Sequence, residues 1–318
     1  MMSREKIRLN NTADRREFLR AIGVISSALT FPSRIFSARK PSILLFTKSS
    51  GYEHAVIKNT DGKPSVVEEA LRGLGARHGF EVAATKDGRI FDSSEFRAHE
   101  ALFFYTTGDL TKAGTDGQPP MSAQGKQTFL DAVRDGLGFI GTHAASDTFH
   151  PDRNTQGDAG DSSKRETEQG EQSEPYLRML GGEFFAHGKI QPANLIVNDA
   201  SFPGVTAPPQ NLNEEWYSLK KLIPDMHVIL TVDTAGMKGE PYQRPPYPIT
   251  WARQQGKGRA FYTAMGHLPE TWENEFFLSL VAGGIAWAMG HAKASIDANI
   301  AKVAPGYAQI PVLTPAKQ

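Results

Sequence analysis

Short apolar runs alternate with helical segments through the first half of the chain, and this alternation restricts the possible folds more than any other feature. Runs typical of buried strands occupy residues 41–47, 80–84, 101–105 and 138–142. Between them, apolar residues recur at helical spacing over 66–78, and a second helix is predicted over 122–134 behind a Ser122 N-cap. Strands that alternate with helices predict an α/β fold, with a mostly parallel sheet covered by helices on both faces.

The second half of the chain continues this pattern less regularly. Further elements are predicted at 176–180 (helix), 194–197, 227–232 and 259–263 (strands) and 275–290 (helix). Residues 152–174 contain almost no apolar side chains, which is typical of a solvated loop or a mobile flap. We therefore expect one large domain over 39–292, followed by a surface tail over 293–318.

The N-terminus has the pattern of a twin-arginine export signal. The segment Arg15-Arg16-Glu17-Phe18-Leu19 precedes an apolar stretch over 21–31, and small residues follow near Ser37-Ala38. The apolar stretch is shorter than the roughly 20 residues of a membrane-spanning helix. We expect residues 1–38 to be a removable signal and the mature protein to be periplasmic or extracellular, without membrane association. The alternative is an amphipathic surface helix.

Composition excludes several classes of function. The chain has no cysteine, which rules out disulfides, a thiol nucleophile and thiolate metal ligands. Its 35 basic residues balance 35 acidic residues, so no overall charge favours a nucleic acid or an anionic membrane as partner. Glycine-rich phosphate loops and the GxSxG nucleophile motif are also absent from the sequence. The oligomeric state is left open.

Three of the nine histidines follow predicted strand ends. His54 lies in the segment after the first strand, His143 directly follows the fourth, and His267 follows the last. Ligands of open parallel sheets bind beyond the carboxyl ends of the strands, so these side chains are expected on one rim. His187 and Glu215, which we expect in loops, are further candidates for that rim.

Histidine and carboxylate side chains that converge in a cleft suit either a metal site or general acid–base chemistry. The competing interpretation is that each histidine only packs or forms hydrogen bonds. We assign that structural role to His78, His99, His227 and His291, and place His150 in a loop. Aromatic residues that could line a sugar platform, or serve equally well as core, are Tyr52, Tyr105, Phe149, Trp216, Tyr217, Trp251 and Trp272.

Several short motifs occur together in a specific order. They are Gly51-Tyr52-Glu53-His54, Gly138-Phe139-Ile140-Gly141-Thr142-His143, Gly182-Glu183-Phe184-Phe185-Ala186-His187, Glu214-Glu215-Trp216-Tyr217, Pro248-Ile249-Thr250-Trp251, Gly256-Lys257-Gly258-Arg259 and Gly266-His267. Over roughly residues 41–290 the chain resembles the trehalose-utilisation (ThuA-like) family. The resemblance implies a flavodoxin-like fold of the class I glutamine amidotransferase-like type.

The resemblance also implies a position for the reactive centre. In amidotransferases a cysteine nucleophile follows a central strand, and here His143 resembles the occupant of that position. Without cysteine, glutamine hydrolysis through a thioester is excluded. Gly108 would correspond to a loop that supplies backbone donors to an oxyanion. Family members are associated with the breakdown of disaccharides and their 3-keto derivatives, so a small carbohydrate is the expected partner.

These observations lead to one main hypothesis, an exported enzyme that acts on a glycoside or keto-sugar. His143, His187 and His267, with Glu215 as a further candidate, would bind a divalent metal, zinc first, and His54 or Glu215 would carry a proton. The residues predicted to bind substrate are Lys48, Tyr52, Gly108, Asp109, Trp216, Tyr217 and Arg253.

Three alternatives stay open. In a metal-free version, the same residues serve as acid–base groups around an enediol. A non-catalytic carbohydrate-binding module would use the aromatic residues and the 152–174 segment instead. A hydrolase that relies on carboxylates alone lacks a convincing pair at any predicted strand end.

Overall fold

The computed structural model describes residues 40–149 and 174–314, which belong to one compact unit. The predicted signal peptide, His150 and nearly all of the polar 152–174 segment lie outside the described residues. Within the described part, no helix has the length and apolar character needed to cross a membrane.

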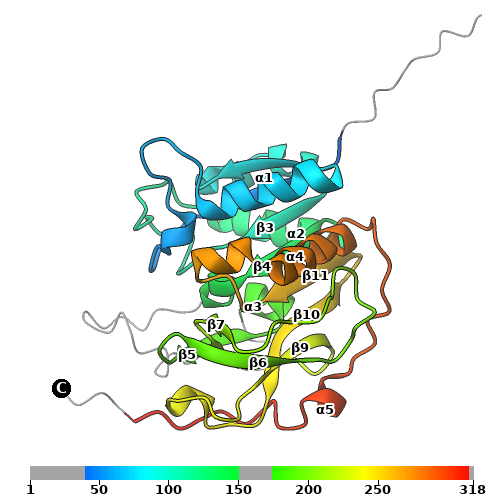
Figure 1. The fold of residues 1–318 in the computed structure, drawn as a ribbon. Coiled ribbons are helices and arrows are strands. Elements are labelled where there is room, and N and C mark those ends of the chain that lie inside the picture. Colours follow the sequence, from blue (N-terminus) through cyan, green and yellow to red (C-terminus); the bar gives the residue numbers. More distant parts are fainter. Residues whose placement is uncertain (1–39, 150–173, 315–318) are drawn as a thin grey trace, which may run out of the picture. The chain divides into compact units, whose positions relative to one another are not determined.

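The unit is a mixed α/β structure built on a nine-stranded sheet, in the order β2-β1-β3-β4-β11-β10-β9-β6-β7 (Figure 1). Its strands are β1 (Ser42–Phe46), β2 (Glu81–Thr85), β3 (Ala101–Phe104), β4 (Gly138–Thr142), β6 (Gln191–Val197), β7 (Leu212–Glu214), β9 (His227–Asp233), β10 (Tyr247–Gln255) and β11 (Gly258–Thr263). The five strands from β2 to β11 run parallel, as the sequence predicts. The four remaining pairings are antiparallel, so the complete sheet is mixed, with its parallel pairings gathered in the half that contains β1 to β4 and β11.

Helices cover both faces of the parallel half. The α-helices are α1 (Val66–His78), α2 (Ala123–Asp135), α3 (Pro175–Leu180), α4 (Glu275–Ala288) and α5 (Ile300–Val303). α1 and α4 contact each other on one face, and α2 and α3 lie behind the sheet in Figure 1. Successive β11 side chains show the same division. Phe261 lies against Gly284 of α4, whereas Tyr262 lies on the face where a Cβ at Gly141 would also meet Leu180 of α3.

Local signals place several elements correctly. The predicted helix over 66–78 and the predicted strand over 138–142 match α1 and β4. The Ser122 N-cap is confirmed, because its Oγ accepts a hydrogen bond from the Gly125 amide at 2.9 Å. Polar N-caps and buried apolar faces therefore fix the half of the fold that presents His143.

The remaining elements depart from the sequence-based expectations. β10 was not predicted, and a separate two-stranded sheet pairs β5 (Glu183–His187) with β8 (Tyr217–Lys220). The predicted loop around His187 is therefore wrong, since His187 ends a strand. Glu215 does lie in a connection, the corner between β7 and β8. The C-terminal tail is not purely superficial, because Ile300 of α5 is buried.

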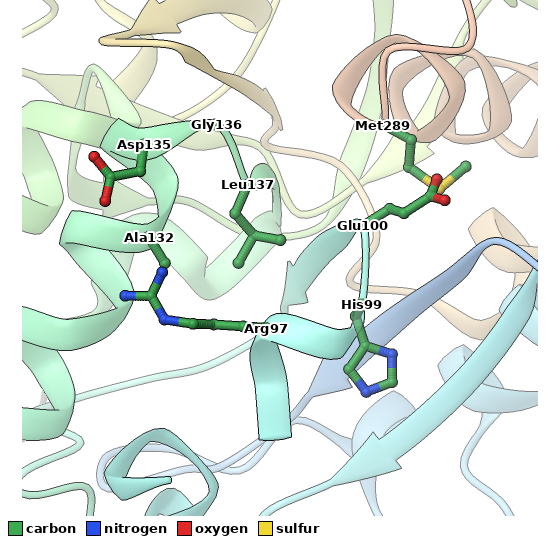
Figure 2. Close-up of a pocket in the computed structure, with 8 residues that line it drawn as sticks. All are labelled: Arg97, His99, Glu100, Ala132, Asp135, Gly136, Leu137 and Met289. Atoms are coloured by element: carbon green, nitrogen blue, oxygen red, sulfur yellow. The ribbon is translucent and has the colours of Figure 1, made fainter. Parts of the chain in front are cut away.

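A cavity of about 380 Å³ opens at the amino ends of β3 and β4 (Figure 2). Its lining residues are Arg97, His99, Glu100, Ala132, Asp135, Gly136, Leu137 and Met289. Glu100 and Leu137 directly precede the two strands, whereas His143 follows the carboxyl end of β4. The cavity is thus at the opposite edge of the sheet from the predicted site and contains none of its residues.

Candidate functional site

His143 occupies a sharp turn at the carboxyl end of β4. Its φ of 44° lies in the left-handed region, which is uncommon for a residue with a side chain. Two hydrogen bonds hold it there: Nδ1 lies 2.8 Å from the Ala264 carbonyl, and the Tyr262 hydroxyl donates to the His143 carbonyl at 2.8 Å. Because a carbonyl only accepts, Nδ1 carries the proton and Nε2 presents a lone pair to the cleft.

His267 is held beside His143 by the loop that leaves β11. Gly266, which precedes it, has a φ of 118°, a conformation that favours glycine. The Gly266 carbonyl accepts hydrogen bonds from the Tyr105 hydroxyl at 3.1 Å and from Trp272 Nε1 at 2.9 Å. β4 and β11 are neighbours in the sheet, so the two histidines leave adjacent strand ends.

Glu215 completes a compact group with these two histidines. Its Oε2 lies 3.1 Å from His267 Nδ1 and 3.4 Å from His143 Nε2. The two ring nitrogens are 3.3 Å apart. Zinc bonds of about 2.0–2.1 Å in a tetrahedral arrangement place ligand atoms about 3.3–3.4 Å apart, so this triangle has the size that one such ion requires.

The protonation pattern of the triangle also suits a cation. The lone pair of His143 Nε2 faces the carboxylate Oε2 of Glu215 at 3.4 Å, so two acceptors oppose each other. His267 Nδ1 can donate one proton, which leaves the repulsion between the other two atoms incompletely relieved. A divalent ion among the three atoms would satisfy every lone pair. The donor set, imidazole nitrogen and carboxylate oxygen, is one that zinc accepts.

His54 lies against the same group from the loop after β1. His54, His143, Glu215 and His267 each offer one potential ligand atom, and these atoms all lie within 4.8 Å of one another. His54 Nε2 is 3.4 Å from the Tyr217 hydroxyl, and its buried Nδ1 has no hydrogen-bond partner. These four residues are called the cluster below. The cluster thus includes His54, which the sequence assigned to proton transfer.

Burial and neighbouring groups shift the acid–base properties of the cluster. Burial, together with His143 and His267, lowers the pKa of His54 to about 2, so this imidazole stays neutral. For Glu215, burial alone would raise the pKa, but the neighbouring His143 and His267 outweigh it and hold the pKa well below normal. Burial alone would lower the pKa of His267, but the hydrogen bond to Glu215 outweighs this effect and raises the pKa above its usual value.

The lowered pKa of His54 predicts a loss of stability in acid for the metal-free protein. The unfolded chain binds a proton at this residue below about pH 6.5, whereas the folded chain does so only near the lowered pKa. Protons therefore favour the unfolded state, and His54 should lower the free energy of unfolding by about 1.7 kcal/mol in total as pH falls from 6.5 to 5. Urea unfolding across this range should show a shallower pH dependence for His54→Phe.

The exposed His78 provides the control for this measurement, because His78→Gln should retain the wild-type pH dependence. The comparison should be made between pH 6.5 and 5. In this range Glu215 is ionised in both the folded and the unfolded chain, so it does not contribute to the slope. Equal slopes for wild type and His54→Phe would contradict a neutral, buried His54.

His187 lies at the solvent-facing side of the cluster. Its Nδ1 is 3.2 Å from the second carboxylate oxygen of Glu215, and 44% of its side chain is exposed. The same nitrogen lies 2.9 Å from the Gly188 carbonyl. His187 is not part of the four-residue set whose ligand atoms converge. The geometry thus places His54 inside the group of converging ligand atoms and His187 at its edge, the reverse of the positions expected from the sequence.

Two of the expected substrate-binding residues adjoin the cluster. The Tyr217 ring lies 4.0 Å from the His143 ring, and the Tyr52 ring contacts His54 edge-on at 4.9 Å. Tyr217 is buried, whereas Tyr52 is 68% exposed. Trp216, which precedes Tyr217, is buried and donates its Nε1 proton to the Gln191 carbonyl. Tyr52 is therefore the best placed of the three to meet a ligand.

The charged side chains of Lys48 and Arg253 are used for structural contacts. Lys48 is buried, 3.7 Å from Asp116, and bonds the Gln118 carbonyl at 2.8 Å. Arg253 pairs with Asp225 and donates to the backbone carbonyls of α3 residues, including Met179 at 2.8 Å. We therefore leave both residues out of the proposed site.

The loop after β3 is also bound internally. The Gly108 amide donates to the Asp147 carbonyl at 2.8 Å, so it is not free to bind an oxyanion. A Cβ at Gly108 would lie 2.6 Å from the Gly51 amide, which explains the need for glycine where two loops meet. Asp109 accepts hydrogen bonds from the amide and hydroxyl of Thr111 in a local turn.

Two residues that contribute to the site were missed in the sequence. Tyr105 appeared only as a general aromatic candidate, although it holds the Gly266 carbonyl. Glu214 received no role, and its buried carboxylate contacts both Glu215 and Gly266. The sequence signal that could have indicated Glu214 is its position directly before Glu215, a candidate ligand. The structural assignment of His227 agrees with its 2.9 Å contact to Asp199.

A protein-family model described as trehalose utilisation (ThuA) matches residues 42–288. The chain belongs to the ThuA family. This confirms the resemblance drawn from the ordered motifs. The match runs from the first residue of β1 to the last residue of α4 and so includes every residue of the cluster.

Solved structures of ThuA family proteins share the fold. A ThuA-like protein from Bacteroides uniformis is 18% identical, with a TM-score of 0.54 over 79% of this chain and 93% of that chain. One from Parabacteroides merdae is 16% identical, with a TM-score of 0.53 over 80% and 93%. No curated protein matches the sequence. At these identities the structural likeness establishes only the common α/β architecture. The chemistry has to be argued from the residues of the site itself.

Proposed function

We propose that this ThuA family protein is an exported enzyme that processes a glycoside or keto-sugar at the cluster formed by His54, His143, Glu215 and His267. The observation that carries the proposal is the triangle of potential ligand atoms, with sides of 3.1, 3.3 and 3.4 Å, at the carboxyl ends of adjacent strands. The family description, trehalose utilisation, supports a carbohydrate as the substrate class.

The cluster is proposed to hold one divalent metal ion, with zinc as the first choice. His143 Nε2, His267 Nδ1 and Glu215 Oε2 are the proposed ligands, and His54 is close enough to be a fourth. When bound, the metal would polarise a carbonyl or hydroxyl oxygen of the substrate. The hydrogen bond from His143 Nδ1 to Ala264 fixes the ring, as outer contacts of metal-binding histidines commonly do.

The residues around the cluster suit a neutral, partly apolar ligand such as a sugar. Tyr52 exposes its ring beside His54, where it can stack against a sugar face. Tyr217 forms a wall along His143, and Phe184 packs behind it at 4.2 Å. These rings would orient the substrate over the cluster and limit the access of water.

Proton transfer is better assigned to His187 than to His54. A general base works best when its pKa is near the working pH, and the pKa of His54 is lowered to about 2. His187 is exposed to water and contacts the outer oxygen of Glu215. We propose that His187 exchanges protons between the bound substrate and solvent, while Glu215 stays ionised and His54 stays neutral within the cluster.

Export and the finer fold assignment belong to the same proposal. Arg15 and Arg16 support a twin-arginine signal, a route that carries folded proteins and so suits metal acquisition before export. The strand order β2-β1-β3-β4-β11 supports a flavodoxin-like, amidotransferase-like core. The absence of cysteine keeps glutamine hydrolysis through a thioester excluded.

The proposal is tested with the mature protein, oxidised disaccharides and mass spectrometry of the products. Purified protein should contain about one zinc ion per chain, and a chelator should remove both the metal and the turnover. Turnover that persists after complete metal removal would favour acid–base chemistry instead. Sugar binding without turnover, unaffected by substitution of His143 and His267, would support a binding module.

A further inference from the structure

Glu214 has a fully buried carboxylate that accepts three hydrogen bonds. Its side chain is 0% exposed. Oε1 accepts from the Glu215 amide at 2.8 Å, and Oε2 accepts from the Gly266 amide at 2.9 Å and the Thr271 hydroxyl at 2.7 Å. Burial of a carboxylate is costly unless its oxygens are satisfied, so this arrangement is a built feature of the fold.

The donors to Glu214 are the backbone segments that carry the proposed ligands. One is the amide of Glu215 itself, and another is the amide of Gly266, which directly precedes His267. A single side chain therefore connects the β7–β8 corner to the loop after β11. These two segments are 52 residues apart in the chain, and neither is positioned by the other through strand pairing.

A carboxylate suits this position better than an amide. Both of its oxygens accept, and here both face N–H or O–H donors. Within the described part of the chain, the contacts that satisfy the Glu214 oxygens are these three hydrogen bonds rather than an ion pair with a Lys, Arg or His side chain. A glutamine would present an NH₂ group to at least one of these donors and leave that contact unmade.

We propose that Glu214 is a positioning residue that sets the distance between Glu215 Oε2 and His267 Nδ1, and through it the affinity of the cluster for metal. This inference rests on the proposed metal-binding function. Outer contacts of metal ligands typically alter metal affinity by about 10–100-fold when they are removed. Glu214 does not itself join the converging ligand atoms.

The test compares Glu214→Gln with wild type and with Glu183→Gln. Glu183 is a matched control, since its carboxylate is also buried but contacts Lys220 and Lys221. Zinc affinity is measured by competition with a chromophoric chelator, and cobalt(II) substitution reports the coordination geometry by its absorption spectrum. The imidazole signals of His143 and His267 are followed by NMR in the metal-free proteins.

Glu214→Gln should weaken zinc binding by about 10–100-fold, alter the cobalt spectrum and shift the His267 imidazole signals. Glu183→Gln should change none of these, even if its thermal stability falls by a similar amount. Unchanged affinity and unchanged imidazole signals in Glu214→Gln would overturn the inference. If wild type binds no metal, the proposed function fails, and the imidazole signals still decide whether Glu214 positions His267.

Discussion

His143→Ala should reduce zinc affinity by more than about 100-fold and abolish detectable turnover of a keto-disaccharide. Loss of an outer contact alone typically costs about 10–100-fold in metal affinity, and this substitution removes a proposed ligand itself. The His143 imidazole is 0% exposed and fixed by Ala264, so no solvent-exposed side chain can easily take its place. Zinc affinity is measured by chelator competition and turnover by product mass spectrometry.

Two further variants separate metal loss from misfolding. His143→Asn removes the imidazole but tolerates the positive φ of this position, so it should fold while binding zinc as weakly as His143→Ala. His227→Ala removes a histidine that pairs with Asp199 away from the cluster and should keep wild-type zinc affinity. Zinc binding that is retained by folded His143→Asn would rule out His143 as a ligand.

Arg253→Met should destabilise the fold by about 2–6 kcal/mol and leave zinc affinity unchanged. The guanidinium donates to the carbonyls of Arg178 and Met179, and both would lose a buried partner, at about 1–3 kcal/mol each. The ion pair with Asp225 adds little, because that carboxylate is 63% exposed. Urea unfolding of the metal-free protein measures the loss of free energy.

Arg134→Met is the matched control for Arg253→Met. Arg134 forms an exposed ion pair with Asp131 on α2, so its substitution should change the free energy of unfolding by less than about 0.5 kcal/mol. If Arg253→Met kept full stability but lost sugar binding, the substrate-binding role first expected for Arg253 would be restored.

Local sequence signals were sufficient for the parallel half of the fold. The apolar run of β4 and the capped, amphipathic α1 are specified by residues close together in the chain, so periodicity identifies them. β10 was not predicted because Pro248 interrupts the strand pattern near its start. In the structure Pro248 lies opposite Thr231 of β9 and precedes Thr250, where the pairing with β11 begins. The pairing of β5 with β8 is equally non-local.

For the site, the sequence by itself determined the available chemistry. It excluded thiolates through the absence of cysteine, placed His143 and His267 after strand ends, and carried the ordered motifs of the ThuA family. Which groups meet was decided only by the tertiary structure. His143 and His267 are 124 residues apart, and His54 and Tyr217 are 163 apart. Their contact depends on strand order and loop packing, which local periodicity does not encode. The same packing places His54 inside the cluster and His187 at its edge.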